Sequence, residues 1–122
     1  MSLPTIWQVV AEGDGRTIAE VLYRPGMLFR MKGLLGRKTL EKGAGIWLKP
    51  CNSIHMFFMK FPIDAIFLDS SGRIVRIYHQ IRPWRITPVI LSSRSVLEIR
   101  AGEAALHQLT EGCQLRITLK KA

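Results

Sequence analysis

The sequence predicts a compact, mainly β domain of antiparallel barrel-like or sandwich form, with one or two short helices. The chain has 122 residues, of which 48% are hydrophobic and 22% charged. This suits one globular domain over residues 1–122 with a hydrophobic core of its own. Short segments rich in β-branched and aromatic residues recur between Gly, Pro and Asp turn signals. Strands and helices do not alternate, which argues against a parallel α/β sheet.

Eight segments are predicted as strands. A Gly13-Asp14-Gly15 turn joins the first two, because these residues tolerate the positive φ of tight turns. Residues 53–61 are apolar on both alternating faces, which predicts a central strand covered on both sides. The eight segments are residues 5–11, 18–23, 46–48, 53–61, 63–68, 73–81, 95–99 and 114–119.

Two segments are predicted as short helices, over about residues 27–40 and 101–110. In the first, leucine and methionine recur at a loosely helical spacing, and Gly33 and Gly36 predict an irregular helix. The second has good helix formers, and Glu103 in its first turn complements the helix dipole.

The chain is strongly basic, with a formal net charge of +9. The excess lies in residues 24–49, which sum to +6, and in residues 70–100, which sum to +5. Two basic segments suggest an anionic partner, such as nucleic acid, an anionic membrane surface or an acidic saccharide. A solvated surface that keeps the protein soluble explains the same charges.

Neither a cofactor nor a metal site is predicted. Cys51 and Cys113 lie far apart without metal-ligand spacing, so they are two free thiols or, in an oxidising compartment, one disulfide. No apolar run is long enough for a membrane span. The N-terminus lacks the form of a signal peptide, but residues 1–3 resemble the remnant of a cloning site. An export signal could therefore have been removed, and the compartment stays open.

Polar and reactive side chains interrupt the apolar run of residues 50–69. His55 suits a general base, a metal ligand or a structural hydrogen bond. Cys51, His55 and Met59 would share one face of a strand, but its rise separates them too far for one metal. Asp64 needs a partner if it is buried: an arginine, a turn contact or, in a dyad, His55.

Seven segments, taken in order, resemble the DUF192 (UPF0127) family of small bacterial and archaeal proteins. The resemblance covers about residues 20–118 and implies a compact, mostly β, barrel-like fold. It also implies an uncharacterised function, and many relatives look exported. The chain departs from the family at Phe61 and Pro62, where an Asn-Thr pair is common, and at Cys113, where Asp is usual. The segments are 32–37 (KGLLGR), 45–48 (GIWL), 54–60 (IHMFFMK), 62–69 (PIDAIFLD), 72–75 (GRIV), 96–102 (VLEIRAG) and 109–113 (LTEGC).

The leading functional hypothesis is a non-enzymatic binding module whose groove recognises a polar or anionic ligand. Arg37, His55 and Asp64 are predicted around that groove, with Trp84 and Arg85 on a mobile rim. One alternative is a small hydrolase or other enzyme that uses His55 with Asp64 or Cys51. The other is nucleic-acid binding, because arginines alternate with aromatic residues over residues 76–85.

Overall fold

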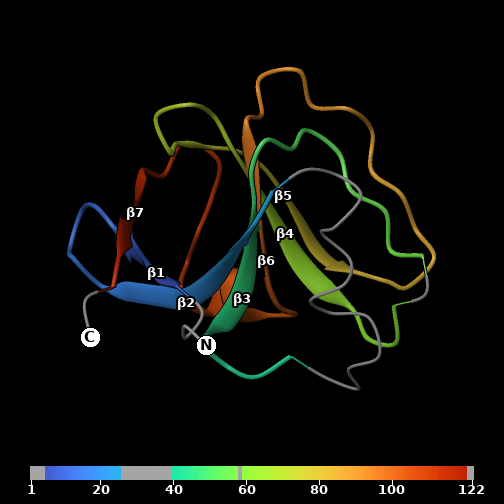
Figure 1. Ribbon diagram of the computed structural model, residues 1–122, viewed down its shortest axis with the longest axis horizontal. Helices are drawn as coiled ribbons and strands as arrows, with labels where there is room; N and C mark the ends of the chain where they lie inside the picture. The colour runs from blue at the N-terminus through green and yellow to red at the C-terminus, as the bar shows by residue number, and fades with distance from the viewer. Residues whose placement is uncertain (1–4, 26–39, 58, 121–122) are drawn as a thin grey trace.

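The protein is built on one curled sheet of seven described strands in the order β5-β4-β6-β3-β2-β1-β7. The computed structural model describes residues 5–25, 40–57 and 59–120. Figure 1 shows the sheet bending from β7 round to β5, which confirms the mainly β, barrel-like prediction. The elements are β1 (Ile6–Ala11), β2 (Thr17–Arg24), β3 (Ala44–Leu48), β4 (Ile63–Leu68), β5 (Ile74–Ile81), β6 (Ser95–Arg100), α1 (Glu103–Leu106) and β7 (Leu115–Leu119).

Neighbouring strands pair antiparallel, as predicted, except that β2 and β3 are parallel. In that pair Tyr23 is in register with Trp47. Parallel neighbours need a connection that returns to the starting end of the sheet, and here it spans residues 25–43. The helix predicted over residues 27–40 falls outside the described residues, apart from the buried core residue Leu40.

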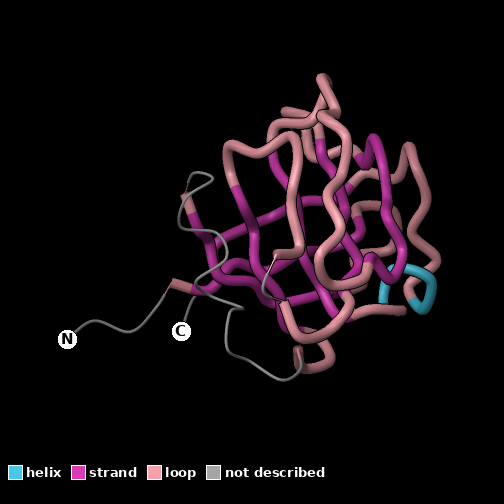
Figure 2. Tube along the Cα trace, turned by 90° about the vertical axis from the view of Figure 1, so that its right-hand side faces the viewer, coloured by secondary structure: helices cyan, strands magenta, loops and turns pink. Residues whose placement is uncertain are grey.

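The sheet carries a hydrophobic cluster on each of its two faces. Along β4 the side chains alternate, so that Ala65 and Phe67 join one cluster and Ile66 and Leu68 join the other. Residues 51–61 complete the first cluster, on what we call the loop side. Ala104 and Leu109, in and after α1, complete the second, on the helix side. Figure 2 shows the helix at one corner of the strands.

The prediction of a strand over residues 53–61 was wrong. Within the described part of this segment, His55 alone forms a β-bridge, with Ile86, and the rest is irregular. The Met59 N–H donates to the Met56 carbonyl at 3.2 Å and closes a turn. This turn changes which side of the segment faces the core. Met56 and Met59 are therefore both buried, although a strand would point them to opposite faces.

The helix predicted near residues 101–110 is present as a single turn. It lies between Gly102 and Gln108, whose positive φ values of 95° and 57° bend the chain at each end. Glu103 is buried, and its Oε1 accepts a hydrogen bond from the Gly43 N–H at 2.8 Å. This bond fastens the turn before β3 to the helix. No helix among the described residues is long and apolar enough to cross a membrane.

Candidate functional site

Three of the five predicted site residues lie on two loops that hydrogen-bond to each other, residues 49–62 and 82–94. The Met56 N–H donates to the Arg85 carbonyl, and the Trp84 N–H donates to the Met56 carbonyl, both at 2.7 Å. His55 lies beside this pairing, in its β-bridge with Ile86. Figure 1 shows the two loops together beside β4 and β5. Arg37 falls outside the described residues.

His55 is half-buried at the base of an aromatic group on these loops. Its Nδ1 accepts a hydrogen bond from the Phe57 N–H at 3.3 Å, and its ring centroid is 4.8 Å from that of Phe57. The Phe57 ring is in turn 6.0 Å from Trp84. The bond to Nδ1 leaves Nε2 to carry the proton in the neutral ring.

Asp64 is not part of this group. It is fully buried in β4, and its carboxylate accepts three backbone hydrogen bonds. The Gln80 N–H donates to Oδ1 at 2.8 Å, and the Gly102 and Ala104 N–H groups donate to Oδ2 at 3.0 and 2.9 Å. Its partners are main-chain groups of β5 and of the turn into α1, so the His55–Asp64 dyad is not formed.

A second buried acid, Glu98, received no site role from the sequence. Its side chain is fully buried in β6, in register with Ile46 of β3 and Ala65 of β4. Alternation along β6 places it with Val96 on the loop side of the sheet. A carboxylate between the apolar residues Val96, Leu97 and Ile99 is the signal that could have drawn attention to it.

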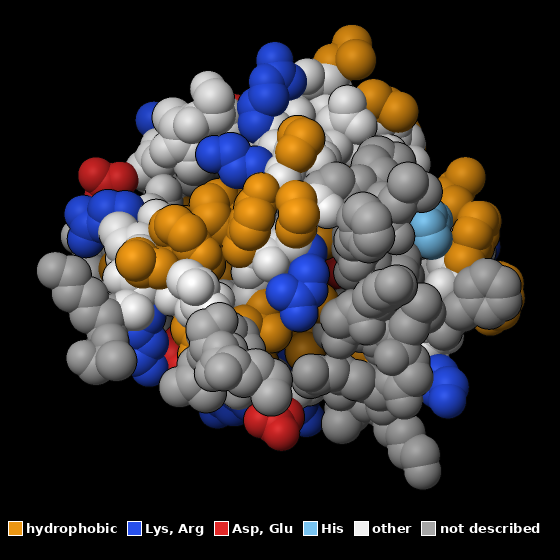
Figure 3. All heavy atoms as spheres, in the orientation of Figure 1, with side chains coloured by type: hydrophobic (Ala, Val, Ile, Leu, Met, Phe, Trp, Pro, Cys, Tyr) orange, Lys and Arg blue, Asp and Glu red, His pale blue; other side chains and the backbone are white. Residues whose placement is uncertain are grey.

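The most distinctive surface feature is a hollow lined by Trp7, Tyr23, Trp47, Lys49, Pro50 and Arg94, which we call the aromatic groove. Its volume is about 460 Å³. The Trp47 ring meets Trp7 edge-on at 5.4 Å and Tyr23 at 5.8 Å between centroids. Lys49 Nζ stands 5.5 Å from the centre of the Trp47 ring. Figure 3 shows hydrophobic side chains gathered between β7 and β3, with Lys and Arg side chains at their border.

A second hollow of about 410 Å³ continues from the aromatic groove. The two share Trp47, Lys49 and Arg94, and the second adds Arg116 of β7 and Asp69 of the β4–β5 turn. The side chains of Lys49, Arg94 and Arg116 are exposed. No carboxylate of the described residues forms an ion pair with any of them. Trp47 Nε1 is buried and donates to no acceptor among the described residues.

Sequence reasoning missed the aromatic groove because long-range pairing builds it. Trp7 and Trp47 lie in β1 and β3, with β2 between them in the sheet. Tyr23 meets Trp47 only because β2 and β3 are parallel and in that register. Nothing local in the sequence indicates either fact.

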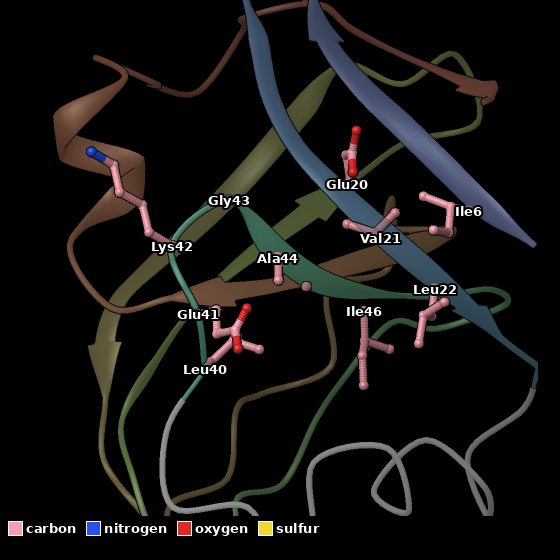
Figure 4. Close-up of a pocket in the computed structure, with 11 residues that line it drawn as sticks. Ile6, Glu20, Val21, Leu22, Leu40, Glu41, Lys42, Gly43, Ala44 and Ile46 are labelled. Carbon is pink, nitrogen blue, oxygen red and sulfur yellow. The ribbon is translucent and has the colours of Figure 1, made fainter. Parts of the chain in front are cut away.

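A further hollow, of about 360 Å³, lies where β2 and β3 run side by side near residues 40–43. Figure 4 shows Ile6, Val21, Leu22 and Ile46 around it, with the Lys42 side chain directed away from them. Glu20, also on its wall, forms an ion pair with Lys120. Glu41 is a further charged residue of this hollow, and none of the described residues that line it is aromatic.

Asp69 and Cys113 have shifted pKa values, and both shifts come mainly from local hydrogen bonds. The Ser71 hydroxyl, followed by the backbone N–H groups of Arg73 and Ser71, lowers the pKa of Asp69 against the opposing effect of burial. Hydrogen bonding to Thr110 lowers the pKa of the Cys113 thiol, and the positive charge of Arg16 adds to this. Cys51 and Cys113 are not joined by a disulfide, and Cys51 is buried.

Two solved structures with the same fold come from bacteria. A proposed transcription regulator from Sinorhizobium meliloti 1021 matches with a TM-score of 0.75 at 21% identity, over 93% of each chain. A protein of unknown function from Novosphingobium aromaticivorans matches with a TM-score of 0.75 at 22% identity, over 91% of this chain and 83% of that one. At this identity the likeness shows the fold.

Curated relatives come from the archaeal genus Thermococcus. A UPF0127 protein of Thermococcus gammatolerans is 43% identical over 60 residues, which is 49% of this chain and 39% of the relative. A UPF0127 protein of Thermococcus kodakarensis is 32% identical over 90 residues, 70% of this chain and 56% of the relative. The chain thus spans between about a third and just over half of the relatives it matches.

The DUF192 family model, described as "Uncharacterized ACR", matches residues 11–117. That range includes β2 to β6 entirely, together with the last residue of β1 and the first three residues of β7. The match agrees with the order of motifs and with the curled sheet. The chain belongs to the DUF192 (UPF0127) family, whose function is uncharacterised.

Proposed function

We propose that the protein is a non-enzymatic binding module whose aromatic groove holds an anionic ligand that carries a ring. The observation behind this is the meeting of Trp7, Tyr23 and Trp47 with the cations Lys49 and Arg94 around one hollow. Ligand sites typically combine apolar and aromatic walls with a few polar groups that fix orientation. The groove has this composition.

Each part of the groove matches one part of such a ligand. The rings of Tyr23 and Trp47 offer apolar surface on which a sugar ring or a base can pack. Lys49 and Arg94 can meet an acidic group because neither forms an ion pair with a described carboxylate, although Arg94 Nη1 already donates to the Leu91 and Ser93 carbonyls. An acidic saccharide meets both requirements.

A single-stranded nucleic acid is the second candidate, because its bases stack on aromatic side chains and its phosphates meet cations. One protein of the same fold is named as a proposed transcription regulator. The two candidates differ in salt dependence. Nucleic-acid binding weakens steeply with salt as counterions are released, whereas one carboxylate held by two cations gives a shallow slope.

This proposal changes the roles that the sequence suggested for Asp64 and His55. Asp64 serves as a structural residue, because its carboxylate is committed to three main-chain donors. A role for His55 in ligand binding stays a prediction, and the His55→Ala variant tests it. Turnover that a broad hydrolase screen detected, and that His55→Ala removed, would overturn the non-enzymatic proposal.

The test is a calorimetric titration with an oligouronate, its neutral counterpart and a single-stranded oligonucleotide. Lys49→Gln removes a groove charge and should weaken binding of the acidic ligand by about tenfold or more. Lys42→Gln is the matched control, since Lys42 is exposed and lies outside the aromatic groove. Tyr23→Leu removes one ring and should cost several-fold in affinity. Equal affinity for the acidic and neutral saccharides, or equal losses in the two lysine variants, would refute the proposal.

A further inference from the structure

The loop 82–94 presents an apolar surface to solvent, together with its neighbour Phe57. A soluble protein normally exposes large hydrophobic side chains singly, and a group of them marks an interaction site. Here they gather on two loops that pair with each other. They are Phe57 (40% exposed), Trp84 (59%), Ile86 (66%), Val89 (57%) and Leu91 (83%). We call them the apolar loop surface.

The fold holds these side chains outward. Thr87 and Ser93 of the same loop are buried, and they bind the main chain of the neighbouring loop. The Ile54 N–H donates to Thr87 Oγ1 at 3.0 Å, and Ser93 Oγ donates to the Cys51 carbonyl at 3.0 Å. With these positions fixed against the core, the intervening apolar residues are left on the outside.

The charges on the same two loops all have one sign. Residues 49–62 contain Lys49 and Lys60, residues 82–94 contain three arginines, and neither segment contains Asp or Glu. Arg82, Arg85 and Arg94 are exposed. The surface therefore combines apolar side chains with positive charge that no acid of its own loops balances, which suits a target that is both apolar and anionic.

We propose that the apolar loop surface docks the protein peripherally onto an anionic phospholipid bilayer. Tryptophan and long aliphatic side chains insert at the boundary between headgroups and acyl chains, while arginines meet the acidic headgroups. Exposed aliphatic side chains such as Ile86, Val89 and Leu91 contribute nothing to base stacking, so nucleic acid fits less well. Arginine and aromatic residues are also enriched in protein–protein interfaces, but the uniformly positive charge of both loops matches the uniformly acidic headgroups of a bilayer.

The proposal is tested by sedimentation with vesicles of phosphatidylcholine alone or mixed with phosphatidylglycerol. The protein should bind the mixed vesicles at least about tenfold more strongly, and added salt should weaken that binding. The double variant Ile86→Ser/Leu91→Ser should lose at least about tenfold in partitioning. Leu106→Ser is the control, because Leu106 is also an exposed leucine (62%) but lies on α1, and this variant should bind like the parent.

A second measurement locates the inserted residue. Lipids with brominated acyl chains quench tryptophans that reach them, so they should quench the parent protein. Trp84→Phe should abolish this quenching, although Trp7 and Trp47 of the aromatic groove remain. Arg85→Gln, which changes charge and leaves the apolar side chains intact, should reduce binding to the anionic vesicles several-fold.

Three results would overturn the proposal: equal binding to both kinds of vesicle, equal losses in Leu106→Ser and the double variant, or quenching that persists in Trp84→Phe. If the double variant Ile86→Ser/Leu91→Ser lost oligonucleotide binding but kept its vesicle binding, the surface would be assigned to nucleic acid instead. Lys49→Gln tests the aromatic groove with soluble ligands, so failure of one proposal is distinguishable from failure of the other.

Discussion

The three hydrogen bonds on the buried carboxylate of Asp64 predict that Asp64→Ala is strongly destabilising. The carboxylate joins β4 to Gln80 in β5 and to Gly102 and Ala104 at the start of α1. Gln80 and Gly102 both have positive φ, 50° and 95°. The acid thus stabilises two bends of the main chain at once, and alanine would remove all three acceptor contacts.

The size of the effect follows from the burial of the three donors. The Ala104 N–H lies in a buried hydrogen bond, and leaving it unpaired costs about 1–3 kcal/mol. The Gln80 and Gly102 bonds are only partly buried, so water can reach their N–H groups and each loss costs about 0.5–1.5 kcal/mol. The expected loss in the free energy of unfolding is therefore about 2–6 kcal/mol.

Urea unfolding followed by circular dichroism measures this loss. With a urea dependence of about 1.5–2 kcal/mol/M for a chain of this size, the midpoint should fall by at least about 1 M. Asp14→Ala is the control, since its ion pair with Arg16 is exposed and contributes about 1 kcal/mol or less. Hydrogen exchange adds a local measurement: the amides of Gln80, Gly102 and Ala104 should exchange faster in the variant.

Asp64→Asn gives an intermediate case if the alanine variant fails to fold. The asparagine carbonyl can still accept from one side, while its amide group faces the remaining donors, so stability should fall less than in Asp64→Ala. A loss in Asp64→Ala no larger than that in Asp14→Ala would refute the structural role. If Asp64→Ala were more stable than the parent, a functional role for the Asp64 carboxylate would be favoured, because functional groups often lower the stability of a protein.

Three other predictions concern the main-chain packing at Gly45 and the lowered pKa values of Asp69 and Cys113. Gly45→Ala should lower the free energy of unfolding by about 1–3 kcal/mol or more, because its Cβ would stand 2.5 Å from a main-chain oxygen of β6, and urea unfolding checks this. Because the folded-state pKa of Asp69 lies below its ordinary 3.8, its stabilisation is present above about pH 4 and is lost as pH falls below that value. Asp69→Asn should therefore flatten the acid limb of a stability–pH curve, and an unchanged limb would contradict this. Cys113 should react with iodoacetamide before the buried Cys51, and Thr110→Val should slow that reaction by raising the pKa of the Cys113 thiol.

Local sequence signals are enough to predict most of the strands. Seven of the eight predicted segments are strands in the structure, because alternation, β-branched residues and Gly or Asp turns are local signals. The Gly13-containing hairpin and the turn after Asp69 follow from the same chemistry. The family resemblance, which depends on motif order, was confirmed over residues 11–117.

Tertiary contacts decided the remaining features. Residues 53–61 have the composition of a strand, but their main-chain groups bind the loop 82–94, a partner no local pattern reveals. The parallel register that brings Tyr23 to Trp47 arises from a long connection. Asp64 looked like a candidate for an ion pair or a dyad, yet its partners are main-chain N–H groups 16 to 40 residues away. Side-chain type shows that a buried group needs a partner, whereas only the packed chain decides which group satisfies it.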